Sequence, residues 1–342
     1  MSTNGHGNRA PRGWRGVAIQ VVGLAVGLAL LGWCVSVALR PENRDQLGRL
    51  REAPPWMIAG VVGLSAGSLV FNAAVFWSLI RPARKLGFGH VLAVNCVATC
   101  LAYLPFKLSL VFRFFVHRVR DGIPVPTIAA WVAAAGMSLV VVCGPVAGVA
   151  ALGLRGVALI PVAAGVAVAV AWGVSAAARA FAGSGGMARI RCLSSGLGIV
   201  MIDRAARTRT FEHLQAGFGM VGERFPWWAA IAFRAGDLAV QSARFWIAAR
   251  ILGLELDIAP AVVLGVTYYA LGAASPSGAI GIREGGATGV AALLHLDGGG
   301  SYAGVTLLVS AADAVPTVLA AMSGALLLRR WGTRVDRTRA SG

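Results

Sequence analysis

Charged residues are scarce in this sequence. Asp, Glu, Lys and Arg together account for 13% of the 342 residues, whereas hydrophobic residues account for 57%, and the mean hydropathy is +0.72. Soluble domains are about one quarter charged, so this chain has too few charges to cover a water-exposed surface. Short strands of alternating hydrophobicity are also lacking, which argues against an outer-membrane barrel. The sequence therefore predicts a helical membrane protein.

Cysteine and histidine are also few, with five of each. Cys96 and Cys100 share a helix face, but no further Cys or His completes a metal set around them. We therefore interpret the cysteines as small core residues and expect neither a metal nor a cofactor. No Ser/His or paired-Asp constellation lies within the apolar spans, so we also expect that the chain is not an enzyme.

Acidic residues number only 14 against 31 basic ones, which gives a net charge of +17. Such a balance can indicate nucleic acid. Here, however, the Arg and Lys residues cluster between and beside the apolar runs, as in cytoplasmic loops that face anionic lipid headgroups. The distribution therefore argues against nucleic acid and favours membrane lipids as partners.

Six apolar runs are long enough to cross a bilayer core, which needs roughly 20 residues. The first run follows a basic segment and is longer than the apolar region of a signal peptide, so we expect it to be retained as a helix. The six runs cover residues 17–39, 56–80, 127–153, 157–180, 227–250 and 302–328.

Two further apolar stretches are interrupted near their middle. Residues 88–117 are broken around Pro105, and residues 258–295 are broken around Pro276. The basic segments predict that both termini are cytoplasmic, in a multi-pass protein of the inner membrane. With that orientation each broken stretch must enter and leave on one face, and the two faces are opposite. We expect two re-entrant hairpins; the alternative is pairs of ordinary spanning helices kinked at proline.

These elements predict an all-α polytopic fold, with six full spans plus two re-entrant hairpins in inverted repeats. Paired broken segments in matching positions indicate a transport site near the repeat interface. Residues 183–226 are expected to form amphipathic helices on the inner membrane surface, with a disordered loop as the alternative. The predicted parts are a basic cytoplasmic tail (1–16), the first repeat (17–153), the second repeat (157–328) and a second basic tail (329–342).

Charged residues within one apolar run share a helical face. Arg234, Asp237, Gln241 and Arg244 are spaced by three, four and three residues. An ionisable group at the bilayer centre costs about 2.5–3.5 kcal/mol, so it marks a paired or functional position. Asp237 can neutralise one arginine and leave the other for a ligand. The alternative is an internal ion-pair ladder to Glu284 or Asp313.

The second broken stretch carries a charged pair directly after its turn. Arg283 and Glu284 follow a segment that contains Pro276, Gly278 and Gly281. Glycines allow close backbone approach to a ligand, and the amides of a helix N-terminus attract anions. Arg283 could hold a phosphate while Glu284 pairs with a cation or titrates. A capped helix start is the alternative.

Three further charged residues are candidates for the same site. Lys107 and Arg113 lie six residues apart and could flank a headgroup path, with snorkelling at the inner interface as the alternative. Asp313 is the most isolated acid of the chain. We expect it to be a counter-ion to Arg283 or Arg244, with proton coupling as its second possible role.

Residues 276–284 and the segment from Pro105 through Arg113 to residues 121–124 resemble the flippase-like family called the lysylphosphatidylglycerol synthase transmembrane region. The resemblance covers roughly residues 15–330 and implies a polytopic lipid flippase of the cytoplasmic membrane. It carries the family's motif residues onto Pro276, Gly278, Gly281 and Glu284, and onto Pro105 and Arg113.

The chain departs from the family pattern in two places. Residues 127–153 lack charged residues, and Asp313 stands where a basic residue is more usual. Bifunctional relatives add a soluble aminoacyl-transfer domain, which we do not expect here. The leading hypothesis is a translocase for an anionic or headgroup-modified lipid of the phospholipid, polyprenyl-phosphate sugar or hopanoid type. The alternative is a non-transporting scaffold, whose partner would be a lipid- or envelope-synthesis enzyme.

Overall fold

The computed structural model describes residues 13–154, 156–183, 185–186, 188–189, 192, 217–275, 278–296 and 302–340. Within these ranges the regular elements are helices, as predicted for an all-α protein. The principal helices are α1 (Gly13–Ala38), α2 (Arg44–Glu52), α3 (Pro55–Ile80), α4 (Phe88–Leu101), α5 (Leu108–Val119), α6 (Val125–Ala151), α7 (Leu159–Phe181), α11 (Arg224–Ile251), α12 (Ile258–Ala274), α13 (Ile282–Leu293) and α14 (Tyr302–Ala340).

Five helices are long and apolar enough to cross a membrane: α1, α3, α6, α7 and α14. Each matches a predicted span, so the polytopic helical fold is confirmed. The sixth predicted span corresponds to α11, which has 28 residues but carries buried Arg234, Asp237 and Arg244. Charges that face the interior of a bundle are compatible with a spanning helix. The count of six crossings stays a prediction.

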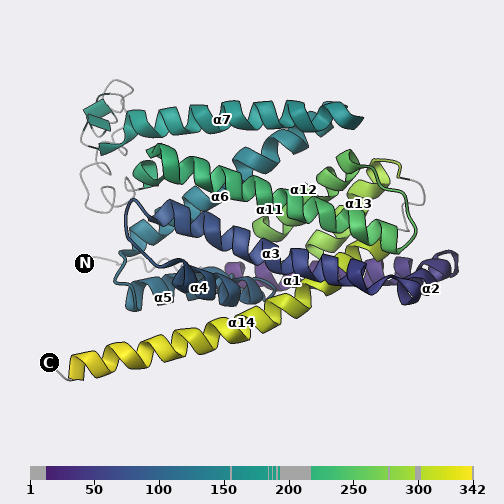
Figure 1. Cartoon of the computed structure of the whole chain (residues 1–342), viewed down its shortest axis with the longest axis horizontal. Coiled ribbons are helices and arrows are strands. Elements are labelled where there is room, and N and C mark those ends of the chain that lie inside the picture. Colours follow the sequence, from purple (N-terminus) through teal and green to yellow (C-terminus); the bar gives the residue numbers. More distant parts are fainter. Residues whose placement is uncertain are drawn as a thin grey trace, which may run out of the picture.

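The long helices run along the long axis of the molecule, with α3 and α11 packed together at its centre (Figure 1). Helix α7 lies on one side of this pair and α14 on the other, while α6 crosses behind the pair and packs on α7, α11 and α3. The largest fully buried side chains include Trp131 and Trp227. Their indole N–H groups donate to the carbonyl oxygens of Phe76 at 2.8 Å and Ala171 at 3.0 Å. These bonds satisfy the polar end of each ring inside the core.

The first broken stretch forms a helical hairpin of α4 and α5. Its two ends meet, because His90 near the start of α4 is hydrogen-bonded at 3.0 Å to Asp121, which follows α5. The helices have 14 and 12 residues, or about 21 Å and 18 Å. Both are shorter than the roughly 30 Å hydrocarbon core. The chain therefore enters and leaves this hairpin at the same end of the bundle.

The second broken stretch forms a hairpin of α12 and α13. The Tyr302 hydroxyl at the start of α14 donates to the carbonyl oxygen of Glu255, just before α12, at 2.9 Å. The chain thus returns to the end from which α12 started. Helix α14 then runs to the other end, where Arg120 after α5 donates to the carbonyl oxygen of Leu328 at 2.9 Å. The two hairpins consequently enter the bundle from opposite ends (Figure 1).

The tips of the two hairpins touch in the middle of the molecule. The backbone N–H of Ala279 donates to the carbonyl oxygen of Ala102 at 3.2 Å. Gly278 has φ +105°, and a side chain there would approach the Tyr103 carbonyl oxygen to 2.9 Å. Pro105 lies in the first tip, between α4 and α5, whereas Pro276 lies outside the described residues. This geometry fits the predicted re-entrant hairpins. Their depth in the membrane, which separates them from pairs of spanning helices, stays a prediction.

Helix contacts follow the same plan in both halves. Helix α3 packs on α4 as α11 packs on α12, and α14 packs on α4 as α6 packs on α12. Inverted repeats would produce this pattern; the repeat boundaries themselves stay predictions. Most of the predicted amphipathic stretch and residues 1–12 of the first tail lie outside the described residues. The second tail, predicted from residue 329, continues α14 as far as Ala340.

Candidate functional site

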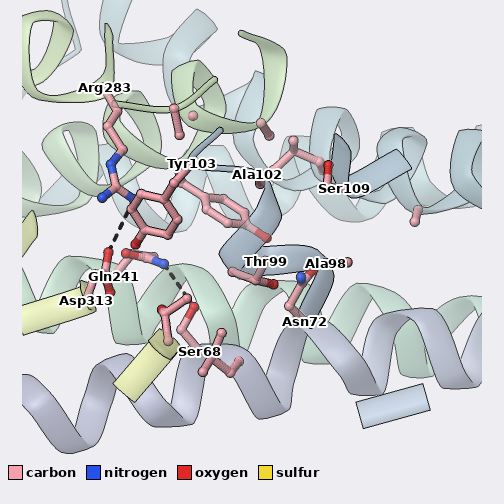
Figure 2. Close-up of a pocket in the computed structure, with 18 of the residues that line it drawn as sticks. Ser68, Asn72, Ala98, Thr99, Ala102, Tyr103, Ser109, Gln241, Arg283 and Asp313 are labelled. Atoms are coloured by element: carbon pink, nitrogen blue, oxygen red, sulfur yellow. Dashed lines mark hydrogen bonds and ion pairs between the residues drawn. The ribbon is translucent and has the colours of Figure 1, made fainter. Parts of the chain in front are cut away.

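A cavity of about 300 Å³ lies where the two hairpin tips meet α3, α6, α11 and α14 (Figure 2). Ligand pockets in proteins span roughly 300–1,000 Å³, so the space suits a small polar group. Three arginines against one aspartate leave its lining with a net charge of +2. Its polar lining consists of Ser65, Ser68, Asn72, Thr99, Tyr103, Ser109, Arg113, Arg234, Gln241, Tyr268, Tyr269, Arg283, Asp313 and Thr317.

The charged face of α11 points into the bundle. Arg234, Asp237, Gln241 and Arg244 are all buried, as their spacing predicted. Arg234 donates to Asp237 at 3.2 Å, and the Ser68 hydroxyl donates to the same carboxylate at 2.6 Å. Asp237 therefore neutralises Arg234, which is the pairing expected from the sequence.

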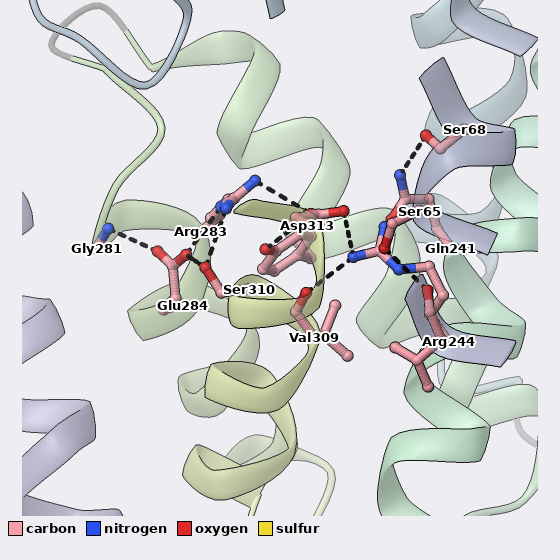
Figure 3. A network of polar contacts seen from close by, with 12 residues as sticks. Ser65, Ser68, Gln241, Arg244, Gly281, Arg283, Glu284, Val309, Ser310 and Asp313 are labelled. Carbon is pink, nitrogen blue, oxygen red and sulfur yellow. Dashed lines mark hydrogen bonds and ion pairs between the residues drawn. The ribbon is translucent and has the colours of Figure 1, made fainter. Parts of the chain in front are cut away.

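Asp313 joins two arginines from different helices (Figure 3). One carboxylate oxygen lies 2.6 Å from Arg244, and the other lies 3.5 Å from Arg283. Arg244 also donates to Gln241 at 2.8 Å and to the carbonyl oxygen of Val309 at 3.0 Å. Asp313 is thus a counter-ion to both arginines, as expected. For Arg244 this pairing is the internal ion-pair ladder that was the alternative to ligand binding.

Glu284 is fully engaged in holding the tip of the second hairpin. Its carboxylate accepts the backbone N–H of Gly281 at 2.6 Å, Arg283 Nε at 2.9 Å and the Ser310 hydroxyl at 2.5 Å. The structure thus has the capped helix start that was expected from the sequence as the alternative to ligand binding. The cap satisfies the Gly281 N–H, which would otherwise lack an acceptor at the start of α13. Gly281 has φ +80°, and a Cβ there would lie 1.6 Å from the carbonyl oxygen of Gly27 in α1.

Arg283 connects the two hairpins through aromatic rings. Its guanidinium lies 4.6 Å from the ring centroid of Tyr103, in the first hairpin, and 4.6 Å from that of Tyr268 in α12. Its terminal nitrogen donates to Ser310 at 3.0 Å. With two acids, a hydroxyl and two rings around it, Arg283 is well compensated for its burial.

Arg113 is compensated far less. Only 6% of its surface is exposed. One guanidinium nitrogen donates to Asn95 at 2.5 Å and the group lies 4.0 Å from the Phe76 ring centroid, but the other terminal nitrogen has no hydrogen-bond partner. Of the ion pairs found among the described residues, none includes Arg113. A buried charge without a counter-ion is expensive, so an anion in the cavity would stabilise it.

Two asparagines link Arg113 to the α11 network. Asn72 accepts a hydrogen bond from Arg234 at 3.1 Å and donates to Asn95 at 3.1 Å. The Asn95 oxygen also accepts from Arg113. Each amide therefore has its acceptor oxygen turned toward a guanidinium, and one terminal nitrogen of Arg113 is left buried without a hydrogen-bond partner among the described residues.

The remaining candidates lie around the tips. Lys107 caps α5 with φ 50° and, like Pro105, is absent from the described lining of the cavity. Gly278 and Gly281 make close backbone contacts rather than lining it. Arg113 points inward, so the snorkelling alternative does not describe it.

Two features of the structure were missed in the sequence. The chain has only four tyrosines. Three of them line the cavity: Tyr103, Tyr268 and Tyr269. Because tyrosine is rare in this chain, its positions could have been considered as site candidates from the sequence. The second feature is a cluster of His90, His117 and Asp121 at the base of the first hairpin.

No curated protein matches the sequence. A comparison with protein families matches residues 20–321 to the lysylphosphatidylglycerol synthase TM region. The match contains both hairpins and every residue that lines the cavity. The chain therefore belongs to the lysylphosphatidylglycerol synthase TM region family, and it is a multi-pass helical membrane protein of lipid and envelope biology.

Proposed function

We propose that the protein is a translocase of the cytoplasmic membrane for lipids with an anionic headgroup, and that Arg113 receives the lipid phosphate. The observation that carries the proposal is the buried guanidinium of Arg113, which lines the cavity without a carboxylate partner. A phosphate oxygen would supply the missing acceptor in a charge-assisted hydrogen bond.

The size of the cavity supports transport of the headgroup rather than of the whole lipid. A space of about 300 Å³ holds a phosphate and a small substituent. The acyl chains would stay in the bilayer, where they need no protein cover. The protein would then have to shield only the charged part of the lipid, which is the part that the hydrocarbon core excludes.

The contacts between the hairpins support alternating access. Across the tips we find the Ala279–Ala102 hydrogen bond and the stacking of Arg283 on Tyr103. Rocking of one half against the other would break these few contacts and open the cavity toward one end at a time. This proposal gives the chain no chemical reaction of its own.

The test is lipid movement in proteoliposomes that contain the full chain. Fluorescent phosphatidylglycerol is placed in both leaflets, and an impermeant quencher reports how fast the inner pool becomes accessible. We expect protein-dependent exchange that Arg113→Gln slows by about tenfold or more, which corresponds to one lost charge-assisted hydrogen bond of about 1.5–3 kcal/mol.

Arg250→Gln is the matched control. Arg250 lies near the end of α11, where it stacks 3.8 Å from the Trp246 ring centroid and does not line the cavity. Its replacement should leave exchange unchanged. Absence of protein-dependent exchange for phosphatidylglycerol and for lysylphosphatidylglycerol would refute the proposal. A scaffold for a synthesis enzyme would behave in that way, and it would tolerate Arg113→Gln in cells.

A further inference from the structure

Three potential metal ligands converge at the base of the first hairpin. His90 lies in the first turn of α4, His117 in the last turn of α5, and Asp121 in the loop that follows. His90 Nε2 lies 3.0 Å and His117 Nδ1 lies 2.6 Å from the same oxygen, Asp121 Oδ2. All three ligand atoms lie within 4.8 Å of one another. Two ring nitrogens thus face one carboxylate oxygen around a common point.

The packing around the cluster holds these side chains in place. His117 is only 1% exposed, and its ring lies against Trp131 with the centroids 4.7 Å apart. The backbone N–H of Ile123 donates to the carbonyl oxygen of His117 at 3.0 Å, which fixes the turn that carries Asp121. Side chains that are locked by their surroundings lose little entropy when they bind an ion.

We infer that His90, His117 and Asp121 form a binding site for a divalent transition-metal cation of the Zn²⁺ class. Two imidazoles and one carboxylate are a ligand set that such ions accept, with one or more coordination positions left to water or another ligand. From the sequence we expected no metal site, so this inference replaces that expectation. It does not depend on the proposed translocation.

The hydrogen-bonding state of His117 supports this assignment. Its Nε2 is buried and has no hydrogen-bond partner. When Nδ1 donates to Asp121, Nε2 is an uncompensated acceptor in the core. When Nδ1 instead binds a cation, the proton moves to Nε2, and an N–H group beside an indole ring is weakly favourable. The site would join the start of α4 to the end of α5, one helical turn from Arg113.

The experiment uses the full chain with a histidine-free affinity tag, stripped of metal with a chelator. Co²⁺ is added and its visible ligand-field absorption is followed, and Zn²⁺ is then added to displace it. We expect one Co²⁺ per chain. His117→Ala and Asp121→Asn should each weaken binding by about tenfold or more, as the loss of even an outer-shell partner does.

His295→Asn is the matched control, because His295 follows α13 in the other hairpin and asparagine tolerates its φ of 52°. It should bind Co²⁺ as the wild type does. No stoichiometric Co²⁺ spectrum in the wild type, or equal binding in all variants, overturns the inference and leaves a hydrogen-bonded triad only. X-ray absorption of the Zn²⁺-loaded wild type requires no variant: two imidazole ligands support the site, and one or none refutes it.

Discussion

Replacement of Asp313 by asparagine tests whether the buried ion pairs stabilise the core. Asn has nearly the same size but no charge, so Arg244 and Arg283 both lose a counter-ion. Removal of one partner from a buried pair costs about 3–5 kcal/mol, because the other charge stays buried without compensation. Arg283 keeps Glu284 and lines the cavity, whereas Arg244 is fully buried and has Asp313 as its only carboxylate among the ion pairs described.

We therefore assign most of the loss to Arg244. The expected decrease in the free energy of unfolding is about 3 kcal/mol, which is roughly a 100-fold change in the unfolding equilibrium. The measurement is reversible unfolding of the full chain in mixed micelles, followed by helical circular dichroism. Asp257→Asn is the control, because Asp257 is exposed at the start of α12 without a side-chain capping bond. It should stay within about 0.5 kcal/mol of the wild type.

A double variant separates loss of charge from loss of shape. Arg244→Met combined with Asp313→Leu removes the pair together, and we expect it to unfold less readily than Asp313→Asn alone. The reasoning is refuted if Asp313→Asn lies within about 1 kcal/mol of the wild type, or if the double variant loses as much as the two single changes added together.

Three further results follow from the hairpins. Gly281→Ala should lower the thermal unfolding temperature markedly, because φ is +80° and the new Cβ would collide with the Gly27 carbonyl oxygen; an unchanged temperature contradicts the close approach. Tyr103→Leu should weaken the contact with Arg283 by about 0.5–2 kcal/mol, and Tyr103→Phe should retain it; unfolding free energies that are equal for the two variants would refute the ring contact. Burial raises the pKa of Asp121, but hydrogen bonds from two histidines outweigh it and lower the pKa to about 2. A depressed carboxyl pKa stabilises the fold above the unfolded pKa of about 3.9, and this stability disappears as the pH falls toward 2. Between about pH 3.9 and about pH 2 the free energy of unfolding should therefore fall more for the wild type than for Asp121→Asn. The same decrease in both proteins would exclude the effect.

The helices and the hairpins were predictable from the sequence because each depends on local information. Hydrophobic run length identifies the spans, and proline and glycine mark the two breaks. The inward face of α11 followed from the spacing of Arg234, Asp237, Gln241 and Arg244 alone. Even the pairing of Asp313 could be narrowed to two arginines, since buried acids need a cation.

Contacts between distant segments were not predictable. Tyr103 reaches Arg283 only because the two tips meet, and nothing local to either residue indicates this. His90 and Asp121 are 31 residues apart and meet because the first hairpin closes on itself. Within the described part of the chain, Arg113 is buried without a carboxylate partner because of the side chains that other helices place around it. That environment exists only in the folded bundle and cannot be inferred from the neighbouring sequence.

The joint between the two tips involves main-chain atoms, with Ala279 donating to Ala102. Alanine or cysteine scanning changes only side chains, so it leaves this amide intact and would not detect the contribution of the hydrogen bond. Ala279→Pro removes the N–H donor, because proline has no backbone N–H. The contribution of this hydrogen bond to the contact between the tips is therefore measured by a backbone substitution and not by a change of side chain.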